Sequence, residues 1–398
     1  MKKVLSILIV LAMTGVASAF TPIEFGNGKY LEIFYEGQFG ATYRDVGSGP
    51  DQEDYTTDMN FLRNRVGFIG TYFNWLSFYV QMAYDEESNS TPFYIDLSDS
   101  DKDFYILDAQ IRFTPNKYVN GYIGKMKHNL TRENLEASFT SLSIEKSAFW
   151  NTPYKTSRDI GIAVWGGFFE NKIQYRLDVM EGRVNTEGSP APSSNFRYTG
   201  RIQLSMLDPE TEYNLAGTYL GSQEVLTIGA AYQYEPSAVY GDVAGYGSTK
   251  DYSAYSADMF FEYLTWAGMF TVSAAYLDIE MFDAYTKIDP DEGVLGLNGQ
   301  KNGYNVKLGY MPPVIVNEGR FQLYGRFDSF EFANLPNNDV TFSNQVVQRL
   351  AVGLNFYMLG ENLKLTGEYS RTDFDQEDSN DPMYRDYDSF DLYLQARF

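Results

Sequence analysis

The sequence predicts an all-β fold, a transmembrane antiparallel β-barrel of sixteen strands with an inward-folded third loop. Three observations predict it. Apolar and polar residues alternate with period two in segments of about ten residues, the length that a tilted membrane-crossing strand needs. No apolar run beyond residue 20 reaches the roughly 20 residues of a membrane helix. Aromatic residues make up 17% of a 398-residue chain whose formal net charge is −22, a mixture that favours a sheet with one face toward lipid and one toward water.

The first segment has the features of a secretory signal peptide. Lys2 and Lys3 give it a basic start, a short apolar stretch runs from Val4 to Met13, and Ala17-Ser18-Ala19 fits a cleavage site. A buried helix is the alternative, but the stretch is too short to cross a membrane. We expect residues 1–19 to be removed on export and residues 20–398 to form a single outer-membrane barrel domain.

The alternation is clearest in the closing segment. One face carries Phe390, Leu392, Leu394, Ala396 and Phe398, and the other carries Asp391, Tyr393, Gln395 and Arg397. A soluble sandwich strand alternates too, but here charged residues keep to the second face in nearly every copy along the chain. This pattern predicts a closed barrel with an apolar exterior and a polar lumen.

Sixteen segments meet this description. They span residues 29–43, 60–73, 75–85, 103–114, 118–127, 158–170, 171–181, 195–207, 225–235, 254–265, 269–282, 303–312, 319–330, 346–358, 362–374 and 388–398. Short turns follow the even-numbered segments and longer acidic stretches follow the odd ones, as in barrels with short periplasmic turns and long outer loops. Residues 213–221 fit either an extended periplasmic connection or an extra hairpin, which would make eighteen strands.

The 33 Tyr and 29 Phe have a physical reason in such a barrel, because amphipathic rings gather where hydrocarbon meets headgroups. We expect Tyr72 with Trp75, Phe356 with Tyr357, and Tyr310 to belong to the periplasmic girdle. Stacking on sugars, as in a saccharide channel, is the alternative.

The predicted inner face is basic. Its Arg and Lys candidates are Arg63, Arg65, Arg112, Lys125, Lys127, Lys172, Arg176, Arg197, Arg201, Lys307, Arg320, Arg326, Arg349, Lys364 and Arg397. Its acidic candidates are Glu32, Glu36, Asp85, Asp108, Asp178, Asp258, Glu262, Asp328, Glu368 and Asp391. We therefore expect a lumen with an excess of about five positive charges and outer loops that hold the excess acid. Such basic residues either pair with carboxylates across strands without selectivity, or attract anions along the pore.

The connection at 128–157 is too apolar for a plain solvated loop. Leu135, Phe139, Leu142 and Ile144 are expected to anchor it inside the barrel, where it narrows the pore. Arg132 and Lys146 would then reach the centre beside Lys125 and Lys127. An extracellular flap or a subunit contact is the alternative. The single histidine, His128, is expected to be a polar residue at a strand end rather than a ligand.

The run from residue 61 to 149 resembles the phosphate-selective porins of the O and P type from Gram-negative outer membranes. Arg63, Arg65, Gly67 and Gly70 match the family's R-x-R-x-G-x-x-G strand. Asp108 with Ala109, Gly124 with Lys127, and Glu145 with Lys146 stand where its next motifs fall. The resemblance covers about residues 60–170 well and 205–345 weakly. It implies a sixteen-stranded, usually trimeric barrel with an inward loop and a basic ladder that conducts phosphate or other oxyanions.

These observations together predict an outer-membrane porin for passive diffusion of small anions, with outer-membrane lipid, lipopolysaccharide and two further copies of the chain as partners. The alternatives are a non-selective general porin, a barrel that sheathes a multihaem cytochrome in an electron-transfer conduit, and an adhesin or structural barrel. No enzyme, cofactor or metal site is expected, because the chain has no Cys and one His. Strong acidity also disfavours binding of nucleic acid.

Overall fold

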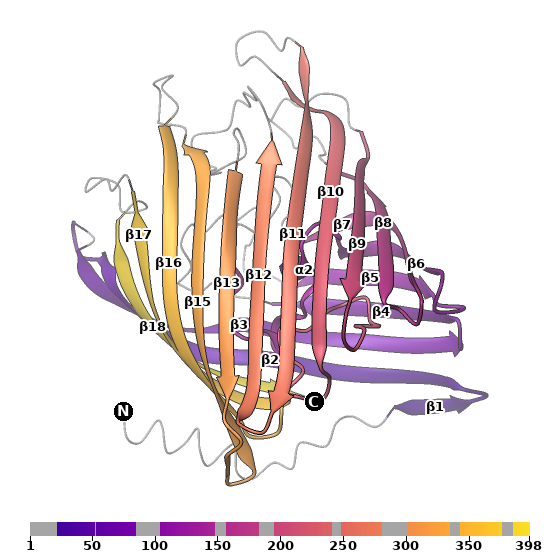
Figure 1. Cartoon of the computed structure of the whole chain (residues 1–398), viewed down its shortest axis with the longest axis horizontal. Helices are drawn as coiled ribbons and strands as arrows, with labels where there is room; N and C mark the ends of the chain where they lie inside the picture. Colours follow the sequence, from indigo (N-terminus) through magenta and orange to yellow (C-terminus); the bar gives the residue numbers. More distant parts are fainter. Residues whose placement is uncertain are drawn as a thin grey trace.

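The computed structural model describes residues 22–51, 53–84, 104–147, 157–182, 195–240, 248–280, 301–334, 343–375 and 385–398. These residues form one antiparallel sheet of eighteen strands (Figure 1). Sixteen strands close into a ring, and the short strands β1 (Ile23–Gly26) and β14 (Ile315–Val316) pair beside it. The predicted signal peptide, residues 1–19, lies outside the described residues.

The strands of the ring follow one another in sequence order. They are β2 (Lys29–Ser48), β3 (Asp54–Phe73), β4 (Leu76–Ala83), β5 (Tyr105–Phe113), β6 (Asn120–Lys127), β7 (Arg158–Phe168), β8 (Ile173–Met180), β9 (Arg197–Ser205), β10 (Val225–Tyr240), β11 (Thr249–Thr265), β12 (Gly268–Glu280), β13 (Lys301–Met311), β15 (Gly319–Asn334), β16 (Ser343–Tyr357), β17 (Leu363–Phe374) and β18 (Tyr387–Arg397). Each of the sixteen predicted segments overlaps one of them, so the predicted fold class is confirmed. The alternative with eighteen strands in the ring is wrong, because residues 213–221 contribute no strand to it.

Pairing between the last and first ring strands closes the barrel. β18 runs antiparallel to β2 from Ser389 opposite Arg44 to Arg397 opposite Glu36. Beyond this ladder, the amide of Phe398 donates to the carbonyl of Tyr35 at 2.9 Å. In Figure 1 the strands of the N-terminal half pass behind those of the C-terminal half. Closure gives each ring strand a hydrogen-bonded neighbour on both sides.

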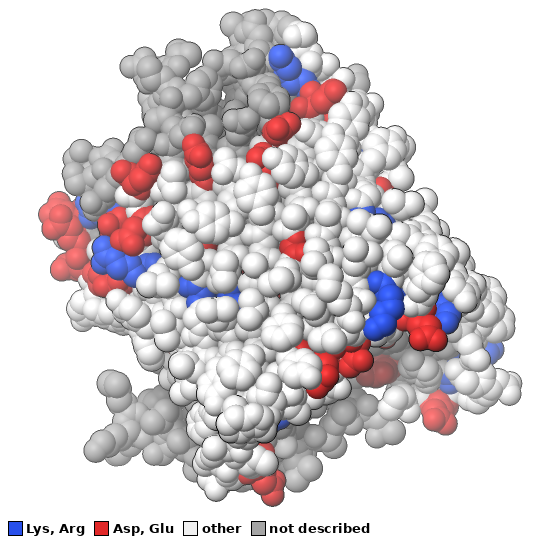
Figure 2. Space-filling model, in the orientation of Figure 1, with Lys and Arg blue, Asp and Glu red and all other residues white. Residues whose placement is uncertain are grey.

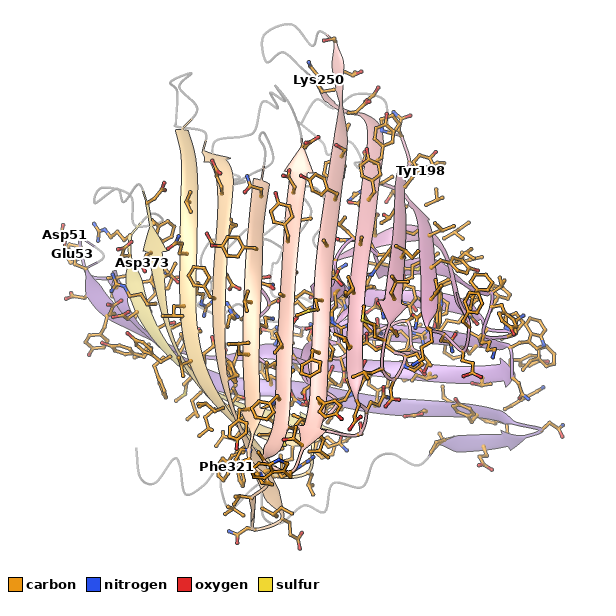
Figure 3. The ribbon with its side chains drawn as sticks, in the orientation of Figure 1. Asp51, Glu53, Tyr198, Lys250, Phe321 and Asp373 are labelled. Atoms are coloured by element: carbon orange, nitrogen blue, oxygen red, sulfur yellow. The ribbon has the colours of Figure 1, made fainter. Side chains whose placement is uncertain are left out.

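Alternation sends polar residues inward and apolar residues outward, as predicted. In β9, Arg197, Arg201 and Gln203 are buried inside the ring, whereas Ile202 and Leu204 are exposed outside it. Figure 2 shows an outer face that is largely free of charge, with most Lys, Arg, Asp and Glu toward its margins. In Figure 3 the labelled Asp51, Glu53 and Asp373 lie together at one end of the strands. Phe321 is labelled far from them, at the bottom of the view. Within the described residues, no helix is both long enough and apolar enough to cross a membrane.

Aromatic residues gather at the ends where the turns are short. The ring of Trp75 stacks on Phe73 at 5.3 Å and lies 6.4 Å from Phe113. Tyr72 is exposed beside them, and the hydroxyl of Tyr310 donates to the carbonyl of Ala267 at 2.8 Å. The rim position expected for these residues agrees with the structure.

Phe356 joins this rim, where it stacks on Phe321 at 4.4 Å. Tyr357 does not, and its prediction as a girdle residue is wrong. Its side chain is buried inside the ring, where its hydroxyl donates to Gln322 at 2.6 Å. The reason is the strand period, because two consecutive residues point to opposite faces.

Glycines in the wall make room for aromatic rings from the neighbouring strand. Tyr324 of β15 stands opposite Gly353 of β16, and a Cβ on Gly353 would lie 2.1 Å from the tyrosine ring. Phe34 covers Gly67 in the same way, with a corresponding distance of 2.0 Å. The ring takes the place of the missing side chain and fixes the register of the two strands.

We predict that Gly353→Ala destabilises the barrel by about 1–3 kcal/mol, because the new methyl group forces the Tyr324 ring out of its place. The displaced ring would also lose the 2.6 Å hydrogen bond from its hydroxyl to Glu368. The measurement is the midpoint of unfolding in denaturant of the protein folded in detergent. Gly325→Ala is the matched control, since its Cβ would meet only the Ala351 carbonyl at 3.9 Å. Equal midpoints for the two variants would contradict the prediction.

Candidate functional site

The connection after β6 folds into the ring, as the sequence predicts. We call residues 128–147 the inward loop. It contains the helix α2 (Arg132–Leu135), capped by the Thr131 hydroxyl, and the short 3-10 helix η1 (Ser138–Thr140). The four expected anchors are all buried, with exposed fractions of 0% for Leu135, 2% for Phe139, 2% for Leu142 and 6% for Ile144. Residues 148–156 lie outside the described part of the chain.

The wall of the barrel holds the inward loop by its backbone. Donors on five strands reach its carbonyl oxygens: Gln395 reaches Phe139, Lys364 reaches Ser141, Asn355 reaches Leu142, Arg63 reaches Ile144 and Arg326 reaches Glu145, at 2.6–3.2 Å. Part of the polar inner face therefore serves to satisfy the buried backbone of the loop.

Most of the predicted basic residues are paired with carboxylates. Arg201 makes two hydrogen bonds of 2.6 Å to Asp258, and Arg197 lies 3.3 Å from Glu235 and 3.4 Å from Asp159. Further ion pairs join Arg63 to Glu145, Lys307 to Glu133, Arg326 to Asp328, Arg349 to Glu368, Lys364 to Glu361 and Arg397 to Glu36, at 2.5–3.4 Å. These pairs match the alternative in which basic residues of the inner face compensate acids across strands.

The side chains that are buried among the described residues carry no excess of positive charge. The buried basic residues are Arg63, Arg65, Lys127, Arg132, Lys146, Arg176, Arg197, Arg201, Lys307, Arg326, Arg349 and Lys364. The buried acids are equal in number: Asp108, Glu133, Glu136, Asp159, Asp178, Glu210, Glu235, Asp258, Glu262, Asp328, Glu368 and Asp391. The inward loop and residues 206–224 add three buried acids, Glu133, Glu136 and Glu210, and two buried bases, Arg132 and Lys146, that the strand pattern does not contain. Asp159 and Glu235 of the ring strands are buried acids beyond the predicted set. Asp85, counted as inward from the sequence, lies outside the described residues.

Lys125 does not face the lumen, and its prediction as a pore-lining residue is wrong. It stands opposite Ile160, which is 54% exposed, and its ammonium group donates to the Ile106 carbonyl at 2.8 Å. Regular alternation accounts for this position, because Tyr122 and Met126 are buried inside the ring and Ile123 is 45% exposed outside it. Lys127 at the end of β6 is the residue that departs from the alternation, since it is buried like its neighbour Met126.

Arg112 and Arg176 also lie inside the ring, but their contacts are aromatic rings and neutral oxygens. The Arg112 guanidinium lies 4.3 Å from the ring centre of Tyr79 and 5.0 Å from that of Tyr122. Arg176 donates to the carbonyl of Tyr213 at 2.5 Å and to that of Glu212 at 3.0 Å. Arg132 differs, because the Glu210 carboxylate binds it with two hydrogen bonds.

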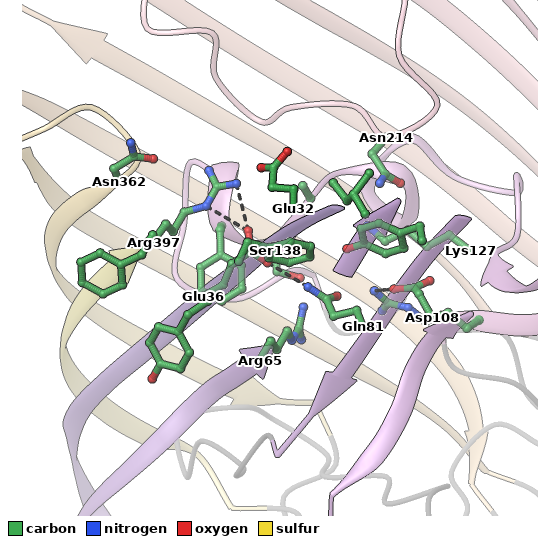
Figure 4. A pocket seen from close by; sticks show the side chains of 18 residues that line it. Glu32, Glu36, Arg65, Gln81, Asp108, Lys127, Ser138, Asn214, Asn362 and Arg397 are labelled. Atoms are coloured by element: carbon green, nitrogen blue, oxygen red, sulfur yellow. Dashed lines mark hydrogen bonds and ion pairs between the residues drawn. The ribbon is translucent and has the colours of Figure 1, made fainter. Parts of the chain in front are cut away.

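A cavity of about 340 Å³ lies between the inward loop and the wall of β2–β5 (Figure 4). Its charged lining residues are Glu32, Glu36, Arg65, Asp108, Lys127, Arg158 and Arg397. Figure 4 shows Glu36 bound to both Arg397 and Gln81. Arg158 pairs with Asp108 at 3.2 Å. Arg65 lies 5.6 Å from the centre of the Phe139 ring.

Two lysines meet beside this cavity. The ammonium groups of Lys127 and Lys146 donate to the same oxygen, the carbonyl of Glu136, at 2.6 and 3.1 Å. We call Lys127 and Lys146 the lysine pair. Burial, with a further contribution from Arg158, lowers the pKa of Lys146 in the inward loop to about 7. The sequence predicts that Lys146 lies beside Lys127, and this part of the prediction is confirmed.

The sequence did not indicate which acids pair with Lys307 and Arg132, namely Glu133 and Glu210. Glu133 and Glu210 lie outside the ring strands, so no alternation marks them as inward. Burial favours the neutral form of Glu210, but the adjacent Arg132 guanidinium holds its pKa below the ordinary value.

His128 is fully buried at the start of the inward loop. The described residues contain no group of three or more His, Asp or Glu arranged to hold a metal ion.

Solved structures of outer-membrane proteins share this fold. OmpF of Salmonella typhi, in complex with daunomycin, matches with a TM-score of 0.60 at 12% identity, over 95% of this chain and 100% of that one. An anion-selective porin from Comamonas acidovorans matches with a TM-score of 0.55 at 10% identity, over 93% and 100%. OmpT of Vibrio cholerae, in a trimer form, matches with a TM-score of 0.53 at 9% identity, over 94% and 100%. No protein-family model and no curated protein sequence matches the chain. The likeness therefore shows the porin fold, and the resemblance to phosphate-selective porins stays a prediction.

We predict that Arg201→Gln destabilises the barrel by about 3–5 kcal/mol, because it leaves the buried Asp258 carboxylate without its main partner. The unfolding midpoint in denaturant measures the effect. Arg371→Gln is the control, since its pair with Asp373 is about half exposed and such pairs contribute about 0–1 kcal/mol. A loss at Arg201 no larger than that at Arg371 would show that Asp258 does not depend on this pair.

Proposed function

We propose that the chain is an outer-membrane channel through which small anions diffuse passively, with phosphate or another oxyanion as the permeant. The observation that carries the proposal is the lysine pair. Two ammonium groups share one neutral oxygen beside the cavity, and Arg65 lines the same cavity. Like charges held this close repel one another, and an anion in the cavity would relieve that repulsion. No energy source is needed, because weak sites in a water-filled pore let ions enter and leave down their gradient.

Two further observations support the anion preference. The fold is similar to that of an anion-selective porin, although at 10% identity. The stretch with Arg63, Arg65, Gly67 and Gly70 resembles the phosphate-selective porins, and both arginines are buried inside the ring. Phosphate as the permeant is supported by the resemblance to phosphate-selective porins and by no other observation.

A non-selective porin is the second candidate, and the equal numbers of buried acids and bases favour it. A barrel that sheathes a cytochrome has less support. The inward loop crosses the lumen of the described structure, and a cavity of about 340 Å³ holds a small solute rather than a protein.

We further propose that the chain works in the outer membrane of a Gram-negative bacterium as a homotrimer. The apolar outer face with aromatic rims suits a lipid bilayer, and OmpT of Vibrio cholerae has a trimer form. Chemical cross-linking of the protein in outer-membrane vesicles is expected to give species up to three copies and no larger. Cross-linking that gives only the single chain would refute the trimer.

We predict that the protein in a planar bilayer under a KCl gradient gives a reversal potential of anion-selective sign. At pH 6, where Lys146 is charged, replacement of both lysines, Lys127→Gln with Lys146→Gln, is expected to lower the chloride-to-potassium permeability ratio by about fivefold per charge, because a unit charge at roughly 4 Å contributes about 1 kcal/mol in water. Lys117→Gln is the matched control, since Lys117 lies exposed in the turn after β5. A reversal potential of zero would favour the non-selective porin, and a cation-selective one would overturn the proposal.

Saturation of the conductance by phosphate, sulfate or selenite, but not by chloride, would identify an oxyanion site.

We predict that the anion preference falls as the pH rises from 6 to 8. Lys146 is charged below its pKa of about 7 and neutral above it, so the positive charge beside the cavity is present at the lower pH and lost at the higher one. The measurement is the reversal potential at each pH. Lys146→Gln is expected to remove the difference, and an unchanged difference in that variant would assign the titration to another group.

A further inference from the structure

The connection between β9 and β10 enters the lumen instead of turning at the rim. Other strands are joined at that end by very short turns, such as Asn74-Trp75 between β3 and β4. Residues 206–224 are longer, and Tyr213, Leu215 and Thr218 among them are 4%, 2% and 3% exposed. We call residues 206–224 the lumenal connection.

The lumenal connection pairs with the inward loop through its backbone. The amide of Leu215 donates to the carbonyl of Leu135 at 3.0 Å, and the carbonyl of Leu215 accepts from the amide of Ala137 at 2.9 Å. One step further, the amide of Gly217 donates to the carbonyl of Thr140 at 3.0 Å. A Cβ on Gly217 would lie 3.0 Å from the backbone of the inward loop. The two segments are therefore in close contact at Gly217, where a larger residue would push them apart.

A buried ion pair joins the same two segments. The Arg132 guanidinium donates to both oxygens of Glu210, at 2.7 and 2.6 Å, and also to the carbonyl of Ala216 at 2.9 Å. Arg132 is 1% exposed and Glu210 is 2% exposed. Glu210 also accepts from the hydroxyl of Tyr219 at 2.5 Å. A bidentate pair of this kind has one well-defined geometry, which fixes the two segments relative to each other.

The wall holds the lumenal connection at both ends. Arg176 of β8 binds it near Tyr213, whereas Glu262 of β11 accepts from the amides of Tyr219 and Gly221 at 2.9 and 3.1 Å. The ring of Tyr213 packs against Tyr122 and Trp165, and its hydroxyl donates to the carbonyl of Lys127 at 2.9 Å. Asn214 reaches the cavity and forms part of its lining (Figure 4).

We infer that the lumenal connection is a second constriction element, which covers the wall from β8 to β11, holds Lys127 and the inward loop in place, and confines the permeation path to the cavity beside β2–β5. This inference rests on the proposed channel function and adds the element that sets the size limit for solutes. In this arrangement the inward loop narrows the pore from one side and the lumenal connection supports it from the other. Loss of the connection would open the covered part of the lumen.

The structure allows a clean excision. The amide of Asp208 donates to the carbonyl of Glu224 at 2.7 Å, so the two ends of the segment are already adjacent. Residues 209–223 can therefore be replaced by Asn-Gly, which joins antiparallel strands in a tight turn. The second variant is Gly217→Val, which separates the connection from the inward loop without removing it. Glu212→Gln is the matched control, because this side chain lies in the same segment and is exposed.

Single-channel conductance in planar bilayers and uptake of uncharged sugars of increasing size into liposomes are the two measurements. We expect higher conductance and passage of larger sugars for the excision variant, a smaller shift in the same direction for Gly217→Val, and no change for Glu212→Gln. Migration on gels before and after heating shows whether the excision variant folds. If it does not fold, the conductance and the sugar limit of Gly217→Val test the inference. Unchanged conductance and sugar limit in every folded variant would overturn the inference while leaving the channel function intact. An absence of conductance in the parent protein would instead overturn the proposed function, and this inference with it.

Discussion

The structure depends on one constraint, the compensation of charge in a lumen that the chain itself fills. A closed antiparallel ring turns every second residue inward, and in this chain many of those residues are Arg, Lys, Asp or Glu. A buried charge is costly unless it is paired and hydrogen-bonded. Arg349 with Glu368 satisfies this requirement across the neighbouring strands β16 and β17, and Arg201 with Asp258 satisfies it across β10, from β9 to β11. Arg132 and Lys307 depend on acids that the ring strands do not provide.

The segments inside the ring follow from that requirement. The inward loop carries Glu133 to Lys307, and the lumenal connection carries Glu210 to Arg132. In return, side chains of the wall satisfy backbone carbonyls of the loop, as Asn355 does for Leu142. The loop and the wall therefore need each other, because neither set of polar groups could be buried alone without unpaired donors and acceptors.

Most of the barrel could be predicted from the sequence, because the strand period is a local property. All sixteen ring strands and the inward loop follow from alternation and from apolar residues in an otherwise polar connection. The predictions for Lys125 and Tyr357 are wrong because of the pleat, since Lys125 falls on the face opposite to the buried Met126 and Tyr357 on the face opposite to its neighbour Phe356. The charge balance could not be predicted in this way. It depends on contacts such as Arg132 with Glu210, which join residues far apart in sequence and lie outside any periodic segment.

The distribution of partners also decides which cations can act on a permeating ion. Arg201 has its terminal nitrogens bound to a carboxylate with two short hydrogen bonds, so an anion would have to compete with a stronger, charged acceptor. Lys127 donates to two neutral carbonyls, those of Glu136 and Leu135 at 2.6 and 3.5 Å, and a hydrogen bond between an ammonium group and a neutral acceptor is weaker than one between two ions. An incoming oxyanion can therefore displace the carbonyl at lower cost than it can displace Asp258. A lumen that is balanced in total charge can in this way still prefer anions, because the preference depends on which positive groups exchange partners and not on the sum of charges.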